Sequence, residues 1–218
     1  MNETPGPVNS LVISPLVLRR ALGCLGLALP FVLAIGGFLT DGTGLQSSIS
    51  GYYYTGMRDV FVGAVCAIAV FLLSYKGYGP EDDHAGSLAG VAAVGLALFP
   101  VTPDSDPTAR QKLFGYVHFL CAALFYLYLA RFSLFLFTKT GKDKAPTRMK
   151  LRRNAVYKAC GYAILTALVL VAAVGLLPAR LIPEVRRLEP VFWLESLAVI
   201  AFGLSWFTKG QAILKDGS

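Results

Sequence analysis

The chain has 218 residues, of which 55% are hydrophobic and only 15% are charged, with a net charge of +7. A typical soluble domain carries roughly 25% charged residues because its surface must stay hydrated. The composition therefore excludes an intrinsically disordered chain and an ordinary soluble enzyme. It predicts an all-α, polytopic membrane protein that forms a single domain over residues 1–218.

Long apolar runs predict where the chain crosses the membrane. A spanning helix needs about 20 mainly apolar residues. Six windows meet this requirement, in chain order 18–39, 58–76, 84–102, 113–138, 155–178 and 190–208. The first window is longer than the core of a signal peptide and no cleavage site follows it, so we expect it to be retained. The prediction is a six-transmembrane-helix bundle.

The distribution of basic residues predicts the orientation. Most Lys and Arg residues fall in segments that lie on the N-terminal side of the membrane if the chain crosses six times, and segment 138–154 supplies most of this excess. By the positive-inside rule, both termini are expected in the cytoplasm, N-in and C-in. A nucleic-acid patch is the other interpretation of 138–154. A short basic loop between apolar runs is more typical of a topology determinant beside anionic lipid, so no nucleic-acid partner is expected.

Aromatic residues near the span ends fit this arrangement. Trp193 and Trp206 bracket the sixth window, and such residues commonly form a belt at each membrane interface. Both tryptophans are therefore predicted to lie at the bilayer surfaces.

Three titratable residues are predicted to share one depth in the outer part of the bilayer. Asp59 opens the second window, while His118 and Glu195 lie about one and a half turns below the outer ends of the fourth and sixth windows. Ionisable groups inside a membrane are costly and usually face a protein interior or a water-filled cavity. We therefore expect these three side chains to meet.

The loop before the second window is predicted to cover this group. It contains the hydroxyl of Ser50, the rings of Tyr53 and Tyr54, and Arg58. Together with Asp59, His118 and Glu195, these residues form a predicted outer-facing polar cavity for a small ligand, an ion or a lipid headgroup.

Several alternatives stay open at this stage. Three such groups can form a structural hydrogen-bond network, serve an ion channel or transporter, or act in an intramembrane metal-dependent hydrolase on lipid. The chain holds only two histidines, which excludes a histidine-rich zinc site, and we assign no metal ligands and no cofactor. Helices with acidic and small residues also suit a homo-oligomer, and a purely structural or assembly role is the remaining alternative.

The acidic segment PEDDHA at 80–85 has two interpretations. Adjacent carboxylates and His84 could bind a metal, but acidic residues at a helix start also complement the helix dipole. We favour the second interpretation.

The segment SSISGYYYTGMRDVFVG resembles a group of uncharacterised bacterial six-span membrane proteins. In that group an outer-loop SIS followed by aromatic residues leads into a second span that begins with RD. The segments VHFLCAALFYLYLARFSLFLFTK and PVFWLESLAVIAFGLSWFTKG are similar to the same group, so the likeness covers most of the chain. The first-loop pattern is more distantly similar to the DRAM/Frag-type membrane superfamily. The resemblance implies a six-helix fold in a bacterial inner membrane and no particular activity.

Overall fold

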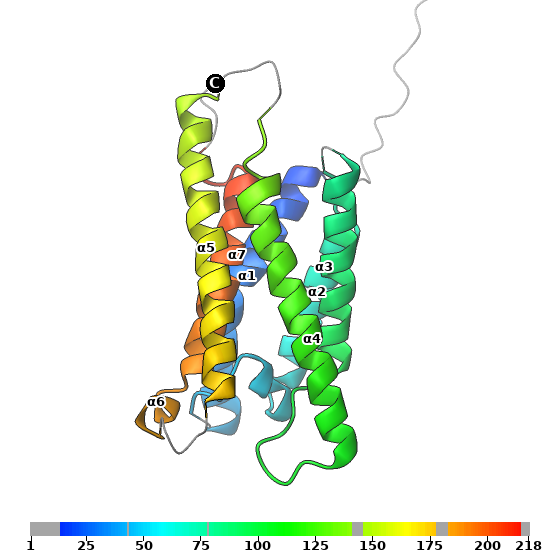
Figure 1. Cartoon of the computed structure of the whole chain (residues 1–218), viewed down its shortest axis with the longest axis vertical. Helices are drawn as coiled ribbons and strands as arrows, with labels where there is room; N and C mark the ends of the chain where they lie inside the picture. The colour runs from blue at the N-terminus through cyan, green and yellow to red at the C-terminus, as the bar shows by residue number, and fades with distance from the viewer. Residues whose placement is uncertain (1–13, 43, 78, 141–145, 178–182, 215–218) are drawn as a thin grey trace, which may run out of the picture.

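The computed structural model describes residues 14–42, 44–77, 79–140, 146–177 and 183–214 (Figure 1). These residues are helical and contain no strand. The α-helices are α1 (Pro15–Asp41), α2 (Arg58–Leu73), α3 (Pro80–Leu98), α4 (Ala109–Arg131), α5 (Arg148–Leu176), α6 (Pro183–Arg187) and α7 (Pro190–Lys209). A 3-10 helix, η1 (Ser50–Tyr54), precedes α2, and a π-helical turn, η2 (Phe132–Leu136), extends α4. The all-α fold class is confirmed.

The helix ends follow local capping chemistry. The Ser14 hydroxyl accepts the Val17 amide at the start of α1, and Pro15 occupies the first helical position. Thr108 and Gln111 form a reciprocal capping box at the start of α4. Such caps satisfy amides that have no partner inside the helix. They place the helix starts within a few residues of the predicted apolar windows.

Four of the helical segments in the described residues are long and apolar enough to cross a membrane. They are Pro15–Asp41, Ala109–Leu136, Arg148–Leu176 and Pro190–Lys209. The two other long helices, α2 and α3, are shorter, and α3 begins with three acidic residues. Large apolar side chains such as Phe38, Leu113 and Val169 are exposed on the outside of the bundle, as a surface facing lipid tails requires.

The long helices run side by side, and the bundle has two distinct ends (Figure 1). α7 packs mainly against α1 and α5, while α3 packs against α2 and α4. One end, here called the loop end, carries residues 44–57 between α1 and α2. The opposite end, here called the basic end, carries Arg19, Lys150, Arg153 and Lys209.

Small residues bring helix backbones into direct contact. A Cβ added to Gly203 on α7 would lie 2.6 Å from the Leu27 amide nitrogen and 2.8 Å from the Gly23 carbonyl oxygen on α1. A Cβ on Gly86 of α3 would lie 2.9 Å from the Leu72 carbonyl oxygen of α2. Close approach of this kind increases dispersion contact between helices where lipid supplies no hydrophobic driving force.

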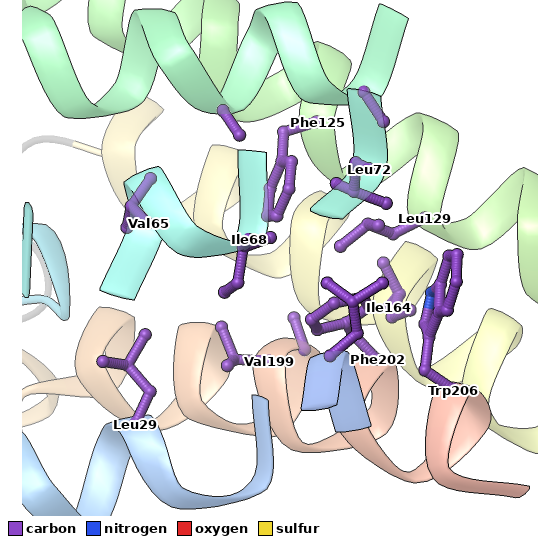
Figure 2. Packing of buried hydrophobic residues seen from close by; sticks show 14 of the residues in the cluster. Leu29, Val65, Ile68, Leu72, Phe125, Leu129, Ile164, Val199, Phe202 and Trp206 are labelled. Atoms are coloured by element: carbon purple, nitrogen blue, oxygen red, sulfur yellow. The ribbon is translucent and has the colours of Figure 1, made fainter. Parts of the chain in front are cut away.

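The core runs along the centre of the bundle and includes one predicted interface residue. Figure 2 shows Val65, Ile68, Phe125, Phe202 and their neighbours packed between α2, α4 and α7. Trp206 belongs to this core and is 0% exposed, whereas Trp193 is 57% exposed. The belt prediction is therefore wrong for Trp206, because its ring packs against other aromatic rings inside the bundle.

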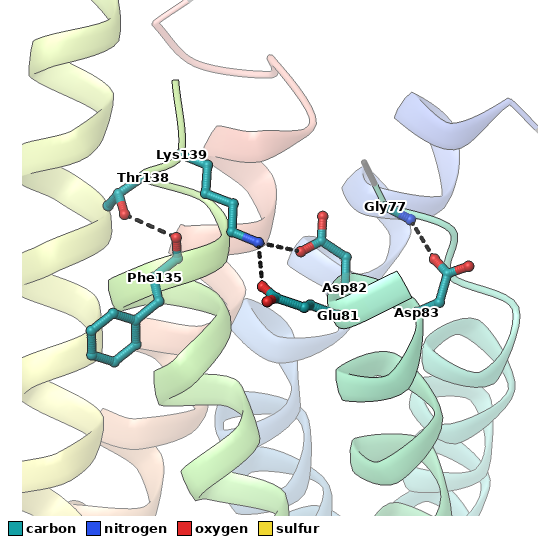
Figure 3. Close-up of polar contacts among 7 residues, drawn as sticks. All are labelled: Gly77, Glu81, Asp82, Asp83, Phe135, Thr138 and Lys139. Atoms are coloured by element: carbon teal, nitrogen blue, oxygen red, sulfur yellow. Dashed lines mark hydrogen bonds and ion pairs between the residues drawn. The ribbon is translucent and has the colours of Figure 1, made fainter. Parts of the chain in front are cut away.

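The acidic residues at the start of α3 form ion pairs and a backbone hydrogen bond (Figure 3). The Lys139 ammonium lies 2.8 Å from the Glu81 carboxylate and 3.5 Å from that of Asp82. Asp83 accepts the Gly77 amide at 2.9 Å and pairs with Lys76 at 3.3 Å. These contacts tie the start of α3 to Lys139 and to the turn at Gly77.

Candidate functional site

The loop before α2 folds back into the loop end of the bundle. Its hydrophobic residues Ile49 and Tyr52 are almost fully buried, and the Tyr52 ring lies 6.2 Å from the ring of Phe192 on α7. The Ser48 hydroxyl accepts the Gly51 amide at 2.9 Å and fixes the turn that leads into η1. This folding carries the Ile49–Ser50 backbone between α4 and α7.

His118 on α4 is held by two hydrogen bonds and is 2% exposed. Its Nδ1 lies 2.7 Å from the Phe99 carbonyl oxygen, and its Nε2 lies 3.0 Å from the Ser50 hydroxyl. A carbonyl oxygen can only accept, so Nδ1 carries the proton. In the neutral imidazole, Nε2 then accepts the hydroxyl proton of Ser50. His118 thus ties the loop to α4.

Glu195 on α7 holds the same turn from the opposite side. One oxygen of its carboxylate accepts the Ile49 amide at 2.7 Å, and the backbone of Ser50 also hydrogen-bonds to it. Among the described residues, no Lys, Arg or His forms an ion pair with this carboxylate. Glu195 is therefore a carboxylate inside the bundle whose protein partners are uncharged amides.

A small, largely enclosed cavity lies next to Glu195. Its volume is about 40 Å³, which is room for about three water molecules. Polar groups come from Ser50, Tyr126 and Glu195. The rest of the lining is apolar and comprises Leu29, Ile49, Phe61, Val65, Ile68, Leu96, Ala122, Phe125, Val199 and Phe202. The carboxylate therefore faces a space that fits a small ion together with a few water molecules.

The structure brings only part of the predicted site together. His118 and Glu195 both contact the Ile49–Ser50 turn. Asp59 is exposed at the start of α2 and does not line the cavity. Two of the three predicted side chains, His118 and Glu195, thus contact one turn. Asp59 does not join them, because the first turn of α2 places it on the outside of the bundle.

The predicted mouth residues lie on the outer surface of the loop. The Arg58 guanidinium donates to the Tyr53 hydroxyl at 2.8 Å and stacks 4.4 Å from the centre of that ring. The Tyr54 hydroxyl donates to the Val101 carbonyl at 2.6 Å. Burial raises the pKa of Tyr54, and the neighbouring Tyr53 adds to this effect, so the hydroxyl stays protonated and keeps its donor role. These three residues brace the loop.

Several functional groups are not visible in the sequence as site residues. Tyr126 lines the cavity and interacts electrostatically with Glu195, but a tyrosine in an apolar helix carries no distinctive pattern. The Phe99 carbonyl and the Ile49 amide are backbone groups, so their residue types give no signal. The position of Tyr126, two turns after His118, is the one clue that the spacing provides.

The arrangement argues against metal-dependent or nucleophilic catalysis. Within the described residues, no group of three or more His, Cys, Asp and Glu could hold a metal ion. Ser50 and His118 are spaced like a nucleophile and its base. However, the backbone amides at Ile49 and Ser50 already bind the Glu195 carboxylate. A negative charge at that place opposes the oxyanion that acyl transfer would create.

Comparisons with family models, with curated proteins and with solved structures give no match to this chain.

Proposed function

We propose that this protein is a multi-pass protein of the bacterial inner membrane that binds a small monovalent cation at Glu195. The proposal places six helices across the bilayer, with both termini in the cytoplasm and the loop end facing outward. The distribution of basic residues supports this orientation, and the resemblance described above supports the six-helix fold and the bacterial inner membrane. H⁺, Na⁺ and K⁺ are the occupants of matching size and charge.

The unpaired carboxylate is the observation that carries the proposal. An ionised carboxylate in an apolar interior is very unfavourable unless a positive charge accompanies it. Among the described residues Glu195 has amide partners but no cationic one. A proton or a bound cation in the adjacent cavity supplies the missing charge.

The size and lining of the cavity select among the predicted ligands. A volume of about 40 Å³ is too small for a lipid headgroup. One carboxylate with a serine and a tyrosine hydroxyl gives too few hard oxygen ligands and too little charge for Ca²⁺ or Mg²⁺. A single monovalent cation balances the one negative charge.

A transporter is the alternative that also uses a buried carboxylate. Apolar side chains of Ile68, Phe125 and Phe202 line the cavity toward the middle of the bundle. The geometry therefore favours binding over conduction.

Cation-dependent stability tests the proposal. A cation that binds only the folded protein raises the unfolding temperature of the purified full chain as its concentration rises. If Na⁺ or K⁺ is the occupant, we expect that ion to raise the unfolding temperature relative to choline at equal ionic strength. If H⁺ is the occupant, we expect an infrared band of a protonated carboxyl group. Glu195→Gln should remove whichever signal is present.

Asp59→Asn is the matched control, because it removes an exposed carboxylate from the same end of the bundle. It should leave the cation effect or the infrared band unchanged. Equal responses of the two variants, or a wild-type protein without either signal, would contradict the proposal.

A further inference from the structure

The group on the far side of the His118 ring fixes which way its hydrogen bond to Ser50 runs. Nδ1 lies 2.7 Å from the Phe99 carbonyl oxygen, which can only accept, so Nδ1 carries the ring proton. Within the described residues no ion pair involves His118, and a buried charge without such a partner is very unfavourable, so the ring is neutral. Its Nε2 therefore presents a lone pair to the Ser50 hydroxyl.

The Ser50 hydroxyl donates its proton to this lone pair. Its oxygen lies 3.0 Å from Nε2, and a hydroxyl turned the other way would set lone pairs of both atoms against each other at that distance. A hydroxyl has one proton and two lone pairs. Because the proton is committed to His118, the lone pairs of the Ser50 oxygen are left for other partners.

Ser50 brings these lone pairs to the cavity beside Glu195. It lines the cavity together with Tyr126 and Glu195, and its backbone hydrogen-bonds to the Glu195 carboxylate. The Ser48 hydroxyl, which accepts the Gly51 amide at 2.9 Å, fixes the turn that holds Ser50 there. The Ser50 oxygen therefore meets the cavity as an acceptor and not as a donor.

A site that only had to stabilise the Glu195 anion would use the Ser50 hydroxyl differently. The Ile49 and Ser50 backbone amides already donate to this carboxylate, and hydrogen-bond donors are what stabilise a carboxylate. His118 takes the hydroxyl proton away from the cavity and leaves an acceptor oxygen close to a negative charge. Acceptor oxygens beside a carboxylate stabilise a cation.

The size and the oxygen atoms of the cavity match a metal cation better than a proton. A proton on Glu195 takes up no space, whereas a metal cation needs room for itself and several oxygen ligands. The volume of about 40 Å³ holds an ion with a few water molecules, and the lining outside the three polar side chains is apolar. Na⁺ is smaller than K⁺ and is satisfied by fewer oxygen ligands, so Na⁺ fits this small set better.

We infer that the cavity is a sodium site in which the Ser50 oxygen is a ligand and His118 is a positioning residue. The inference deepens the proposed function, since it rests on the cation site at Glu195. Glu195 supplies the negative charge, Ser50 and Tyr126 supply neutral oxygen atoms, and water fills the remaining positions. His118 does not touch the ion but turns the Ser50 lone pairs toward it. Each oxygen ligand has a large effect in an apolar cavity, because little solvent screens the ion there.

Cation-dependent unfolding of the purified full chain measures this selectivity. The unfolding temperature is followed against the concentration of NaCl or KCl, with choline chloride keeping the ionic strength constant, and its rise gives an apparent affinity for each ion. In the wild-type protein we expect Na⁺ to bind about tenfold more tightly than K⁺. Equal or tighter binding of K⁺ would overturn the inference.

Removing the Ser50 hydroxyl tests its role as a ligand. Ser50→Ala should weaken Na⁺ binding about tenfold, because a polar contact to a charged group is lost. It should also reduce the preference for Na⁺ over K⁺, since the set of oxygen ligands is then smaller. An unchanged preference in this variant would overturn the inference.

Ser48→Ala is the matched control for the loop. Ser48 is as buried as Ser50 and its hydroxyl also holds the turn, but Ser48 does not line the cavity. Its loss should lower the unfolding temperature in choline chloride and leave the preference for Na⁺ unchanged. Equal changes of preference in Ser48→Ala and Ser50→Ala would show that the ion needs only a folded loop, and would overturn the inference.

Two substitutions of His118 separate positioning from packing. A glutamine side chain can accept the Ser50 proton through its carbonyl, whereas phenylalanine keeps a ring but has no acceptor. Only His118→Phe should reduce the preference for Na⁺, because the Ser50 proton can then turn toward Glu195. His118→Gln should keep the preference even if its unfolding temperature is lower. The same selectivity in both variants would overturn the positioning role of His118.

The failure of this inference is distinguishable from the failure of the proposed function. Stabilisation by Na⁺ that Glu195→Gln abolishes and Ser50→Ala leaves intact supports the cation site and overturns the ligand set. An infrared band of a protonated carboxyl group, in a wild-type protein that neither Na⁺ nor K⁺ stabilises, identifies H⁺ as the occupant. That result supports the proposed function and overturns the sodium site, whereas the absence of both signals contradicts both.

Discussion

The two ends of the bundle hold buried charge in opposite ways. At the loop end a single carboxylate, Glu195, is held by backbone amides. At the basic end the cationic groups of Arg19, Lys150 and Lys209 lie over aromatic rings. The two ends therefore differ in the kind of group that holds a charge inside the bundle, backbone amides at the loop end and aromatic rings at the basic end.

This difference shows how a bundle can keep a charge inside without a matching side chain. Amide dipoles stabilise an anion, and the faces of aromatic rings stabilise a cation. The amides at Glu195 do not neutralise its charge, which leaves an attraction for a cation there. α7 carries both Glu195 and Lys209, so one helix joins the two ends.

The largest expected effect comes from separating α7 from α1. Gly203→Leu forces a side chain into the backbone of α1 at Gly23 and Leu27, and overpacking of this kind costs about 3 kcal/mol. We expect a lower free energy of unfolding in denaturant, together with loss of cation binding at Glu195.

Gly175→Leu on α5 is the control for this prediction, because a Cβ at that glycine meets no atom within 4 Å. Its free energy of unfolding should stay close to that of the wild-type protein. An unchanged free energy of unfolding in Gly203→Leu would contradict the close contact between α7 and α1.

A smaller effect is expected from disturbing the loop end alone. His118→Ala leaves the Ser50 hydroxyl and the Phe99 carbonyl without their buried partner, which costs about 2 kcal/mol. Amide hydrogen exchange should rise in residues 46–57 and remain unchanged around Lys150 and Lys209. His84→Ala, which alters an exposed histidine, should change neither region.

The Ser50–His118 hydrogen bond can be isolated with a double-mutant cycle. If the two side chains act as a pair, the effects of Ser50→Ala and His118→Ala are non-additive by about 1 kcal/mol. Additive losses in the free energy of unfolding would mean that the loop is held mainly by Glu195 and by Tyr52.

The smallest effect concerns the ion pair between Lys139 and Glu81. The hydrogen bond and charge of Lys139 lower the pKa of Glu81, and the same hydrogen bond raises the pKa of Lys139. The stability from Glu81 is therefore present above its unfolded pKa of about 4.3 and is lost as pH falls through the lower folded value. The stability from Lys139 is present below its unfolded pKa of about 10.4 and is lost as pH rises through the higher folded pKa.

Carbon NMR of the Glu81 carboxyl measures this interaction. In Lys139→Met the pKa of Glu81 should return toward its ordinary value. The pKa of Asp83 should move less, because the Gly77 amide is the main cause of its lowering. A Glu81 pKa that does not respond would mean that the ion pair is absent in solution.

The apolar runs predicted the helices because burial in lipid or in a core requires the same long apolar stretches. The windows 18–39 and 190–208 lie within α1 and α7. Hydropathy could not predict η1 or the π-helical turn at Phe132–Leu136, because these depend on contacts with distant parts of the chain. The six-span count and the orientation stay predictions.

The candidate site was predictable only where a side chain carries an unusual charge for its surroundings. His118 and Glu195 met that condition and lie against the same turn. Asp59 also met that condition, but it is exposed at the start of α2. A shift of one residue along a helix turns a side chain by about 100°, so the sequence could not predict its direction. The burial of Trp206 was missed because a tryptophan near the end of an apolar window fits an interface position and a core position equally well.

The unequal helix lengths have a consequence for the surrounding bilayer. α2 has 16 residues and α5 has 29, which correspond to about 24 Å and about 43 Å along the helix axis. In the proposed six-span arrangement, a bilayer core of about 30 Å would thin beside α2, and α5 would tilt or the bilayer would thicken beside it. Lipids with shorter acyl chains should therefore gather on one flank of the molecule, so that the protein imposes a lateral asymmetry on its own annulus.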